Sequence, residues 1–370
     1  MNLFATLFST IILAAKRLWN HRLLMLCLLV GLAVAVALLS SIPLYADAAQ
    51  HQLLKGELTE AGAFRPPFSF LWRYVGTWHG DVAWDDYVPA DEYLSRQVTD
   101  AVGLPLDTAV RHVQTANLRL FPASDDLGFV ADEPLLWTTV GFISGLEEQV
   151  EVVEGEFPPL PSPSVGETEG GSVPLLVSQN LANRLGLQVG ERYTIFGSGR
   201  DGAQIPAQIV GTWRPQNGMA PFWFYEPSAF DEVLLTSEQP FVEQVAPALE
   251  EPVSLAVWYQ IFDGDQVRAG DVPGLLDRVA TTESRIAALL ANTELDVSPV
   301  DALQAYRRAS QSLTVMLTLF SIPTVGLVLF FLSLIAGMVV RRSQAEIATL
   351  RSRGTTRAQV VGIYLLEGIL

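Results

Sequence analysis

Two long stretches without a charged residue constrain this chain more than any other feature. They are LLMLCLLVGLAVAVALLSSIPL, from Leu23 to Leu44, and SLTVMLTLFSIPTVGLVLFFLSLIAGMVV, from Ser312 to Val340. A helix that crosses a bilayer needs about 20 such residues. We therefore predict a first span within residues 23–45, and a stalk followed by a second span within residues 307–340.

A cleaved signal peptide is the alternative for the first run, because Ala46-Asp47-Ala48 resembles a cleavage site. However, the apolar run exceeds the usual core of about 7–15 residues, and 22 residues precede it. An uncleaved anchor is therefore favoured. Within residues 1–22, Leu3–Ala15 is apolar but too short to span. This segment is either a helix in the inner membrane interface or an unstructured tail.

Charge is divided unevenly along the chain. Residues 46–306 contain 13 Lys+Arg against 38 Asp+Glu, a net charge of −25, whereas the whole chain carries −17. The basic residues that flank the apolar runs are Lys16, Arg17 and Arg22 before the first, and Arg341, Arg342, Arg351, Arg353 and Arg357 after the second. By the positive-inside rule, both ends are cytoplasmic and residues 46–306 lie outside the cytoplasmic membrane.

Residues 46–306 have the Gly and Pro punctuation of a folded domain. Strands are predicted over 108–120, 173–177, 192–196, 204–211 and 254–262, and helices over 275–290 and 301–312. Between two of these strands, Ser178 is a good N-cap for a short helix and Gly186 is the expected residue after its end. The predicted fold class is a membrane protein with α-helical spans and a large extracytoplasmic α+β domain inserted between them.

Aromatic residues cluster in two segments, 64–87 and 222–225. Such clusters can bind an apolar ligand or the outer leaflet, but more often they pack a core, which is our expectation here. The chain has no G-x-x-x-x-G-K-[ST], and its only lysines are Lys16 and Lys55, so it contains no P-loop. We predict no enzyme activity, no cofactor and no metal on this chain. Its acidity argues against nucleic-acid binding.

The segment after the second run, RRSQAEIATLRSRGTTRAQVVGIYLLEGIL, changes direction. Gly354 is expected to end a short helix, and Thr356 with Gln359 forms a capping-box pair that starts an apolar one. We predict a cytoplasmic helix and turn over 341–358 and the start of a third span over 359–370. Eleven residues of apolar helix cover about half of the hydrocarbon thickness, so we expect either that the chain is C-terminally incomplete or that its last helix lies flat.

This tail resembles the FtsX-like permease domain of MacB-type ABC transporters. The pattern E-I-A-x-L-R-x-x-G-x-x-R, followed by E-G, is matched by Glu346, Ile347, Leu350, Arg351, Gly354, Arg357, Glu367 and Gly368. The outer passage from Gly155 to Trp213 resembles the periplasmic core domain of the same family.

The resemblance implies a permease subunit of an ATP-driven transporter of the type VII, mechanotransmission kind. Such a subunit moves or extracts a substrate on the outer side of the cytoplasmic membrane. Its implied partners are a cytoplasmic ABC ATPase, which binds ATP and Mg²⁺, and a second permease copy or paralogue. The six matching residues from Glu346 to Arg357 would couple the permease to the ATPase.

Two other classes share the order of span, outer domain and span. A two-span membrane sensor with an extracytoplasmic ligand-binding domain would continue in a long cytoplasmic heptad helix, whereas Gly354 is expected to end the helix here. A surface-anchored adhesion or binding protein would have no further spans and would not depend on an ATPase. The turn after the second run favours the permease.

Overall fold

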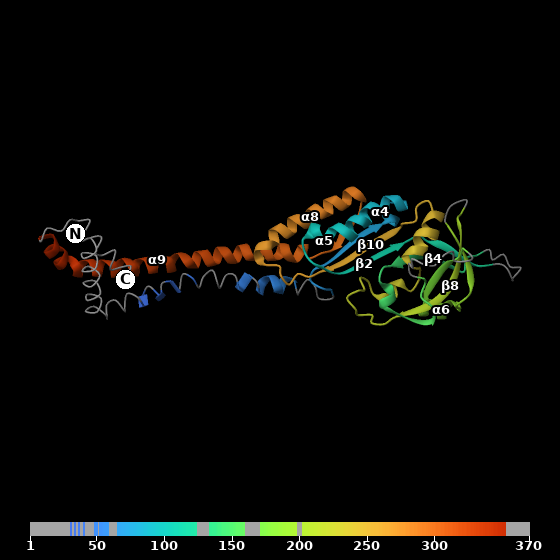
Figure 1. The fold of residues 1–370 in the computed structure, drawn as a ribbon, viewed down its shortest axis with the longest axis horizontal. Helices are drawn as coiled ribbons and strands as arrows, with labels where there is room; N and C mark the ends of the chain where they lie inside the picture. Colours follow the sequence, from blue (N-terminus) through green and yellow to red (C-terminus); the bar gives the residue numbers. More distant parts are fainter. Residues whose placement is uncertain are drawn as a thin grey trace, which may run out of the picture. The chain divides into compact units, whose positions relative to one another are not determined.

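The computed structural model describes residues 30–31, 33–34, 36–37, 40, 48–50, 52–58, 65–123, 133–159, 171–197 and 202–352 (Figure 1). The chain divides into two compact units. One comprises Met1–Leu53 and Arg307–Leu370, and the other comprises Leu54–Tyr306. The predicted segments 1–22 and 359–370 lie outside the described residues. So does most of the predicted first span, of which the described residues between 30 and 40 are helical.

The described strands all belong to the unit Leu54–Tyr306. They are β1 (Ser69–Val75), β2 (Leu106–Gln114), β3 (Leu118–Pro122), β4 (Leu136–Ile143), β5 (Val150–Gly155), β6 (Val173–Ser178), β7 (Arg192–Phe196), β8 (Gln204–Pro215), β9 (Val233–Leu235), β10 (Leu255–Phe262) and β11 (Glu294–Val297). The predicted strands at 173–177, 192–196, 204–211 and 254–262 are confirmed. The predicted strand 108–120 was wrong as one element, because a turn at Thr115–Asn117 divides it into β2 and β3.

Helices connect and cover these strands. The α-helices are α3 (Gly76–His79), α4 (Trp84–Glu92), α5 (Val98–Val102), α6 (Gln179–Leu185), α7 (Glu238–Pro240), α8 (Val272–Leu289) and α9 (Val300–Ser352). The π-helices are η1 (Tyr93–Gln97) and η4 (Phe241–Val245), and the 3₁₀ turns are η2 (Leu146–Glu148), η3 (Pro227–Phe230), η5 (Ala246–Ala248) and η6 (Ala269–Asp271). The predicted helices at 275–290 and 301–312 correspond to α8 and the beginning of α9.

Four strands form an antiparallel sheet in the order β11-β1-β10-β2. Figure 1 shows α4, α5 and α8 on one side of this sheet. Helices α5 and α8 contribute Val98, Leu275 and Ile286 to the interior, and the π-helix η1 contributes Leu94; all four are fully buried. The antiparallel sheet therefore has a continuous helical cover on one face.

Strand β2 also pairs with β4, and β4 belongs to a closed ring of strands. The ring runs β4-β3-β7-β8-β6-β9 and returns to β4 through the parallel pairing of Val140 with Leu234. It is a small barrel, and β5 adds to the end of β8. One core links the barrel to the uncovered face of the antiparallel sheet. It includes Leu71, Val110 and Tyr259 from the sheet, and Trp213 and Phe224 from the barrel side.

The two aromatic clusters are core, as predicted, over most of their length. Phe70, Trp72 and Tyr87 are at most 1% exposed, and Phe224 is equally buried. Trp78 is the exception, since 66% of it is exposed, where the guanidinium of Arg73 lies 5.5 Å from its ring. The aromatic density of this segment is therefore explained by packing.

Helix α6 follows the sequence closely. The hydroxyl of Ser178 accepts a hydrogen bond from the Leu181 amide at 3.0 Å, which satisfies an amide that the first turn leaves free. Gly186 ends the helix in the left-handed conformation at φ 73°. Leu181 and Ala182 are buried against the barrel, and Leu185 is less so.

Candidate functional site

Helix α9 is a single uninterrupted element of 53 residues, about 80 Å long. Its first two turns lie within the folded unit, where Leu303 is fully buried and Tyr306 is 3% exposed. Farther along, most of the large apolar side chains that the structure describes are exposed, although Val328 is buried. The exposed ones are Val315, Met316, Leu319, Ile322, Leu327, Leu329, Phe330, Phe331 and Leu334. A helix with apolar side chains on all sides is typical of a membrane span or of a helix buried by partners.

The hydroxyl groups along this part of α9 bond within the helix. Ser312, Thr314, Thr318 and Ser321 each donate to the carbonyl four residues earlier, at distances from 2.6 to 3.3 Å. Lipid offers no partner for a polar group, so internal satisfaction is what a spanning helix needs. Among the residues that the structure describes, one helix is long and apolar enough to cross a membrane, and its candidate span is Val300–Phe331.

The predicted coupling residues lie at and beyond the end of α9. The backbone at Glu346, Ile347, Leu350 and Arg351 is helical and continues the same helix without a break from the apolar run. Gly354 and Arg357 lie outside the described residues, as do Glu367 and Gly368. Of the helix and turn predicted over 341–358, the described part, which ends at Ser352, is the last part of α9, and the role of these residues stays a prediction.

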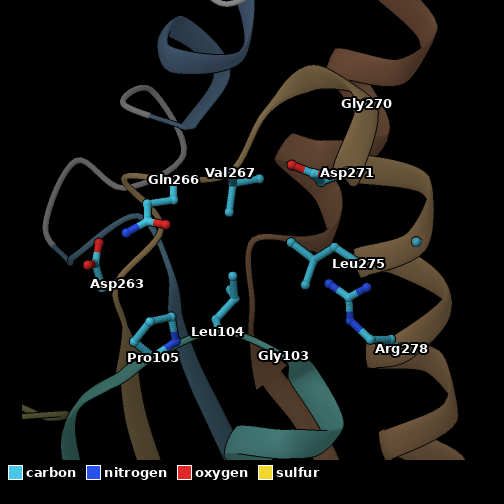
Figure 2. A pocket seen from close by; sticks show the side chains of 11 residues that line it. Gly103, Leu104, Pro105, Asp263, Gln266, Val267, Gly270, Asp271, Leu275 and Arg278 are labelled. Carbon is cyan, nitrogen blue, oxygen red and sulfur yellow. The ribbon is translucent and has the colours of Figure 1, made fainter.

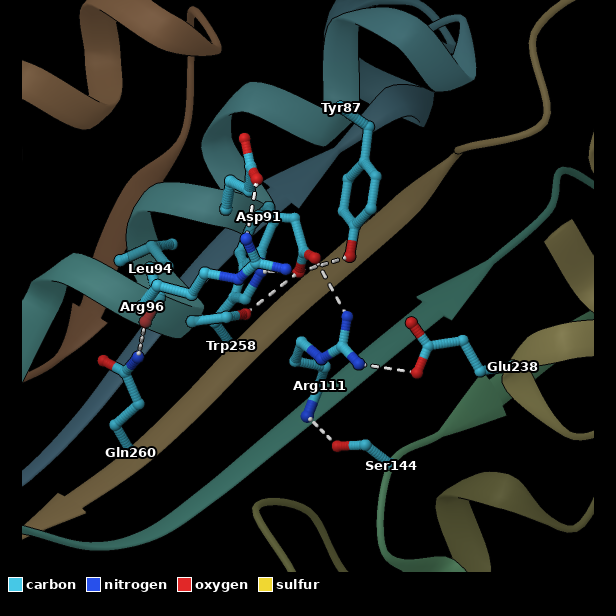
Figure 3. A network of polar contacts seen from close by, with 11 residues as sticks. Tyr87, Asp91, Leu94, Arg96, Arg111, Ser144, Glu238, Trp258 and Gln260 are labelled. Carbon is cyan, nitrogen blue, oxygen red and sulfur yellow. Dashed lines mark hydrogen bonds and ion pairs between the residues drawn. The ribbon is translucent and has the colours of Figure 1, made fainter. Parts of the chain in front are cut away.

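A polar network joins the helical cover to the barrel side of the folded unit (Figure 3). Its centre is Arg111 on β2, whose guanidinium contacts the Asp91 carboxylate on α4 at 2.9 Å and the Glu238 carboxylate on α7 at 2.6 Å. The backbone amide of Arg111 donates to the hydroxyl of Ser144, just after β4, at 2.8 Å. The Arg111 side chain thus connects α4 with α7, and Arg111 and Glu238 are 127 residues apart in the sequence.

Asp91 is the most heavily bonded member of this network. One of its oxygens accepts hydrogen bonds from the hydroxyl of Tyr87 and from the indole of Trp258, both at 2.8 Å. Burial, reinforced by the nearby Asp91 carboxylate, raises the pKa of Tyr87 well above 10.0. Burial alone would lower the pKa of Arg111, but the charges of Asp91 and Glu238 raise this pKa above its ordinary value. The Tyr87 hydroxyl therefore keeps its proton at neutral pH and can donate to Asp91, and the Arg111 guanidinium keeps its positive charge.

Both acidic partners of Arg111 lie just before a π-helix, with Asp91 preceding η1 and Glu238 preceding η4. The wider turn of a π-helix disturbs the regular backbone bonding, and such turns occur often at functional sites. In η1, the side-chain amide of Gln260 on β10 donates to the Leu94 carbonyl at 2.6 Å. The sheet therefore supports the irregular turn directly.

A pocket of about 420 Å³ lies at the other end of the same sheet, between the start of β2, the loop after β10 and α8 (Figure 2). Leu104, Val267 and Leu275 form its apolar part, and each is at most 8% exposed. Its charged lining comes from Asp271 and Arg278, together with Asp263.

Sequence reasoning found neither the network nor the pocket. The contributing residues are far apart in the chain, and none of them forms a local motif. In the described part of the chain, no group of three or more His, Cys, Asp or Glu side chains is placed to hold a metal ion.

No family model matches this chain, and no curated protein matches it. Among solved structures, it is similar to a domain of a candidate permease protein from Porphyromonas gingivalis. The likeness has 13% sequence identity and a TM-score of 0.31, and it covers 63% of this chain and 89% of that one.

Proposed function

We propose that this chain is a permease subunit of an ATP-driven ABC transporter of the mechanotransmission type. In this proposal, α9 crosses the cytoplasmic membrane, the unit Leu54–Tyr306 lies outside it, and a separate ATPase supplies the energy in the cytoplasm. The chain itself performs no catalysis. ATP and Mg²⁺ bind to the ATPase partner, and a second permease copy completes the assembly.

One observation carries the proposal, namely the continuity of α9. The same helix includes Leu303, which is fully buried in the folded unit, and Glu346, in the segment whose sequence resembles a coupling helix. These residues are about 65 Å apart along the helix, whereas the hydrocarbon core is about 30 Å thick. A helix that continues on both sides of the bilayer provides a direct route by which a displacement at the ATPase reaches the outer domain.

The polarity along α9 supports the same assignment. The exposed apolar side chains from Val315 to Leu334 lie within the uncharged run, and Arg341 and Arg342 follow it directly. Basic residues at the end of a span favour the cytoplasmic side. The acidic composition of residues 46–306 agrees with the outer side.

The test is reconstitution of the natural full-length protein with a candidate ABC ATPase in lipid nanodiscs, with ATP hydrolysis as the measurement. We expect the permease to stimulate hydrolysis, and Arg357→Ala or Gly354→Leu to abolish most of that stimulation. Gln344→Ala is the matched control, because Gln344 is an exposed residue of α9 outside the resemblance pattern. Equal stimulation by all four proteins would contradict the coupling role.

A two-span sensor is the second candidate, and the observation that favours it is also the length of α9. A helix that continues for a dozen residues beyond the uncharged run could transmit a ligand-binding signal in a sensor, just as it could transmit an ATPase-driven displacement in a permease. A sensor needs no ATPase for its function. Failure of any ABC ATPase to associate with the full-length protein or to respond to it, together with a ligand-dependent shift of α9, would favour the sensor.

A further inference from the structure

We propose that the pocket between β2, the loop after β10 and α8 binds a small zwitterion, a molecule with one anionic group and one ammonium group on a short apolar body. Amino acids and short peptides have this chemistry, and so do aminophosphate headgroups. The proposal concerns only the folded unit Leu54–Tyr306 and does not depend on the proposed transport function.

The anionic group is assigned to Arg278. This side chain is half-buried, and its Nε donates to the backbone carbonyl of Val102 at 2.7 Å, which fixes the guanidinium at the pocket wall. Among the described residues, Arg278 forms no ion pair. A guanidinium has five N–H donors in a fork that matches a carboxylate or phosphate, and within the described part of the chain only the Nε donor of Arg278 has a hydrogen-bond partner.

Two glycines keep the space beside this guanidinium open. A Cβ atom at Gly103 would lie 3.2 Å from the Arg278 Nε, and a Cβ atom at Gly274 would lie 3.4 Å from its Nη1. Gly103 also ends α5 in the left-handed conformation at φ 72°, which independently favours glycine. Gly274 has no such backbone requirement and lies inside α8, where glycine is unfavourable for helix formation. Its effect is to leave the charged group accessible.

Two carboxylates in the pocket lining, those of Asp263 and Asp271, are available to the ammonium group. Figure 2 shows Asp263 and Gln266 on one side of the pocket, Asp271 and Arg278 on the other, and Leu104 between them. Each carboxylate accepts one backbone hydrogen bond, from the Asp265 and Arg268 amides respectively, so acceptor capacity remains. A simple anion would enter a pocket whose lining holds two carboxylates and one guanidinium, whereas a zwitterion satisfies both signs of charge.

The size and lining of the pocket fit this ligand class. Ligand pockets usually have volumes of about 300–1,000 Å³ and combine an apolar lining with a few polar groups that fix orientation. The volume of 420 Å³ is at the lower end of this range. Leu104, Val267 and Leu275 offer an apolar surface for a small side chain.

The test is isothermal titration calorimetry on the 370-residue chain in detergent, with L-leucyl-L-leucine and sn-glycero-3-phosphoethanolamine as the two probes. We expect at least one to bind with a Kd below about 1 mM. Binding of the dipeptide alone identifies an amino-acid or peptide ligand, and binding of the phosphoethanolamine alone identifies a headgroup. The N-acetylated dipeptide and its C-terminal amide each lack one charge, and each should bind at least ten-fold more weakly. Glycerol 3-phosphate, which lacks the ammonium, is the corresponding control for the headgroup.

Gly274→Leu is the decisive variant, because it places a side chain beside the guanidinium while raising helix propensity. It should weaken binding at least ten-fold without lowering the thermal unfolding midpoint. Gly56→Leu is the matched control, since Gly56 is a helical glycine with open space around its Cβ position, and it should bind like the wild type. The proposal is overturned if neither probe binds, if Gly274→Leu binds as well as the wild type, or if removing either charge from the probe has no effect.

Discussion

The Arg111 network makes a graded prediction about stability. Its two ion pairs differ in environment, because the side chain of Asp91 is 17% exposed and that of Glu238 is 42% exposed, with Arg111 itself at 24%. Removing one partner of a buried pair costs about 3–5 kcal/mol, and an exposed pair contributes about 0–1 kcal/mol. We therefore expect the Asp91 contact to contribute most of the stabilisation.

Three substitutions separate the contributions. Arg111→Met keeps the length of the side chain but leaves Asp91 without its counter-charge, although Tyr87 and Trp258 still donate to it. We expect a loss of about 2–3 kcal/mol, less than for a fully buried pair. Asp91→Asn should cost about 1–2 kcal/mol, because hydrogen bonds to a charged group are lost. Glu238→Gln should cost less than about 1 kcal/mol.

The assay is urea unfolding of the full chain in detergent, followed by tryptophan fluorescence and far-UV circular dichroism. A double-mutant cycle should give a coupling of at least about 1 kcal/mol for Arg111 with Asp91, and no more than about 0.5 kcal/mol for Arg111 with Glu238. Arg96→Ala is the control, because its ion pair with Glu92 is well exposed and should contribute little. If Glu238→Gln costs as much as Arg111→Met, the assignment of the strength to the Asp91 contact is refuted.

Three further predictions concern the folded unit. Ser178→Ala should destabilise it by about 1–2 kcal/mol in the same urea assay, because the hydroxyl caps α6 and also donates to the Asp231 carbonyl at 2.9 Å; Ser178→Thr should recover part of this loss. Gly155→Ala should cost about 2–3 kcal/mol, because φ is 77° and the added methyl group would collide with a backbone oxygen of β8; a thermal midpoint equal to that of the wild type would contradict this. Burial lowers the pKa of His112 below 6.5, so the stability that its neutral ring provides is complete above pH 6.5 and is lost as the pH falls from 6.5 toward the folded-state pKa. The urea midpoint should therefore decrease between pH 7.5 and pH 5 more in the wild type than in His112→Gln.

Local sequence signals predicted the elements that local chemistry determines. The Ser178 cap and the Gly186 stop define α6 without help from the rest of the chain, and 192–196 matches β7 residue for residue. Two of the strands that sequence reasoning missed, β1 and β4, have a different character. In β4, six consecutive residues are buried, and β1 has four, so the alternation that identifies a strand is absent. A strand buried on both faces resembles an aromatic or apolar cluster in the sequence.

The candidate site was less accessible to sequence reasoning, for a topological reason. Closure of the barrel depends on β4 pairing with β9, and the Arg111 network depends on Glu238, 127 residues away. Nothing in the neighbourhood of Arg111 indicates either partner, because the register of distant strands decides which side chains meet. The predicted coupling residues differ from the Arg111 network. They form a local sequence pattern, but the role that this pattern indicates depends on contact with another protein.

The exposed apolar surface of α9 between Val315 and Leu334 must be shielded from water. Nine of its large apolar side chains that the structure describes are exposed, and burying each fully would contribute about 1.5–3 kcal/mol, or about 20 kcal/mol together. That sum exceeds the net stability of about 5–15 kcal/mol of a typical domain, so a long helix of this kind in water would associate or aggregate. The hydroxyls of Ser312, Thr314, Thr318 and Ser321 already bond within the helix and require no water. A bilayer satisfies both conditions without a specific protein partner, which supports the proposal that this part of α9 is a membrane span.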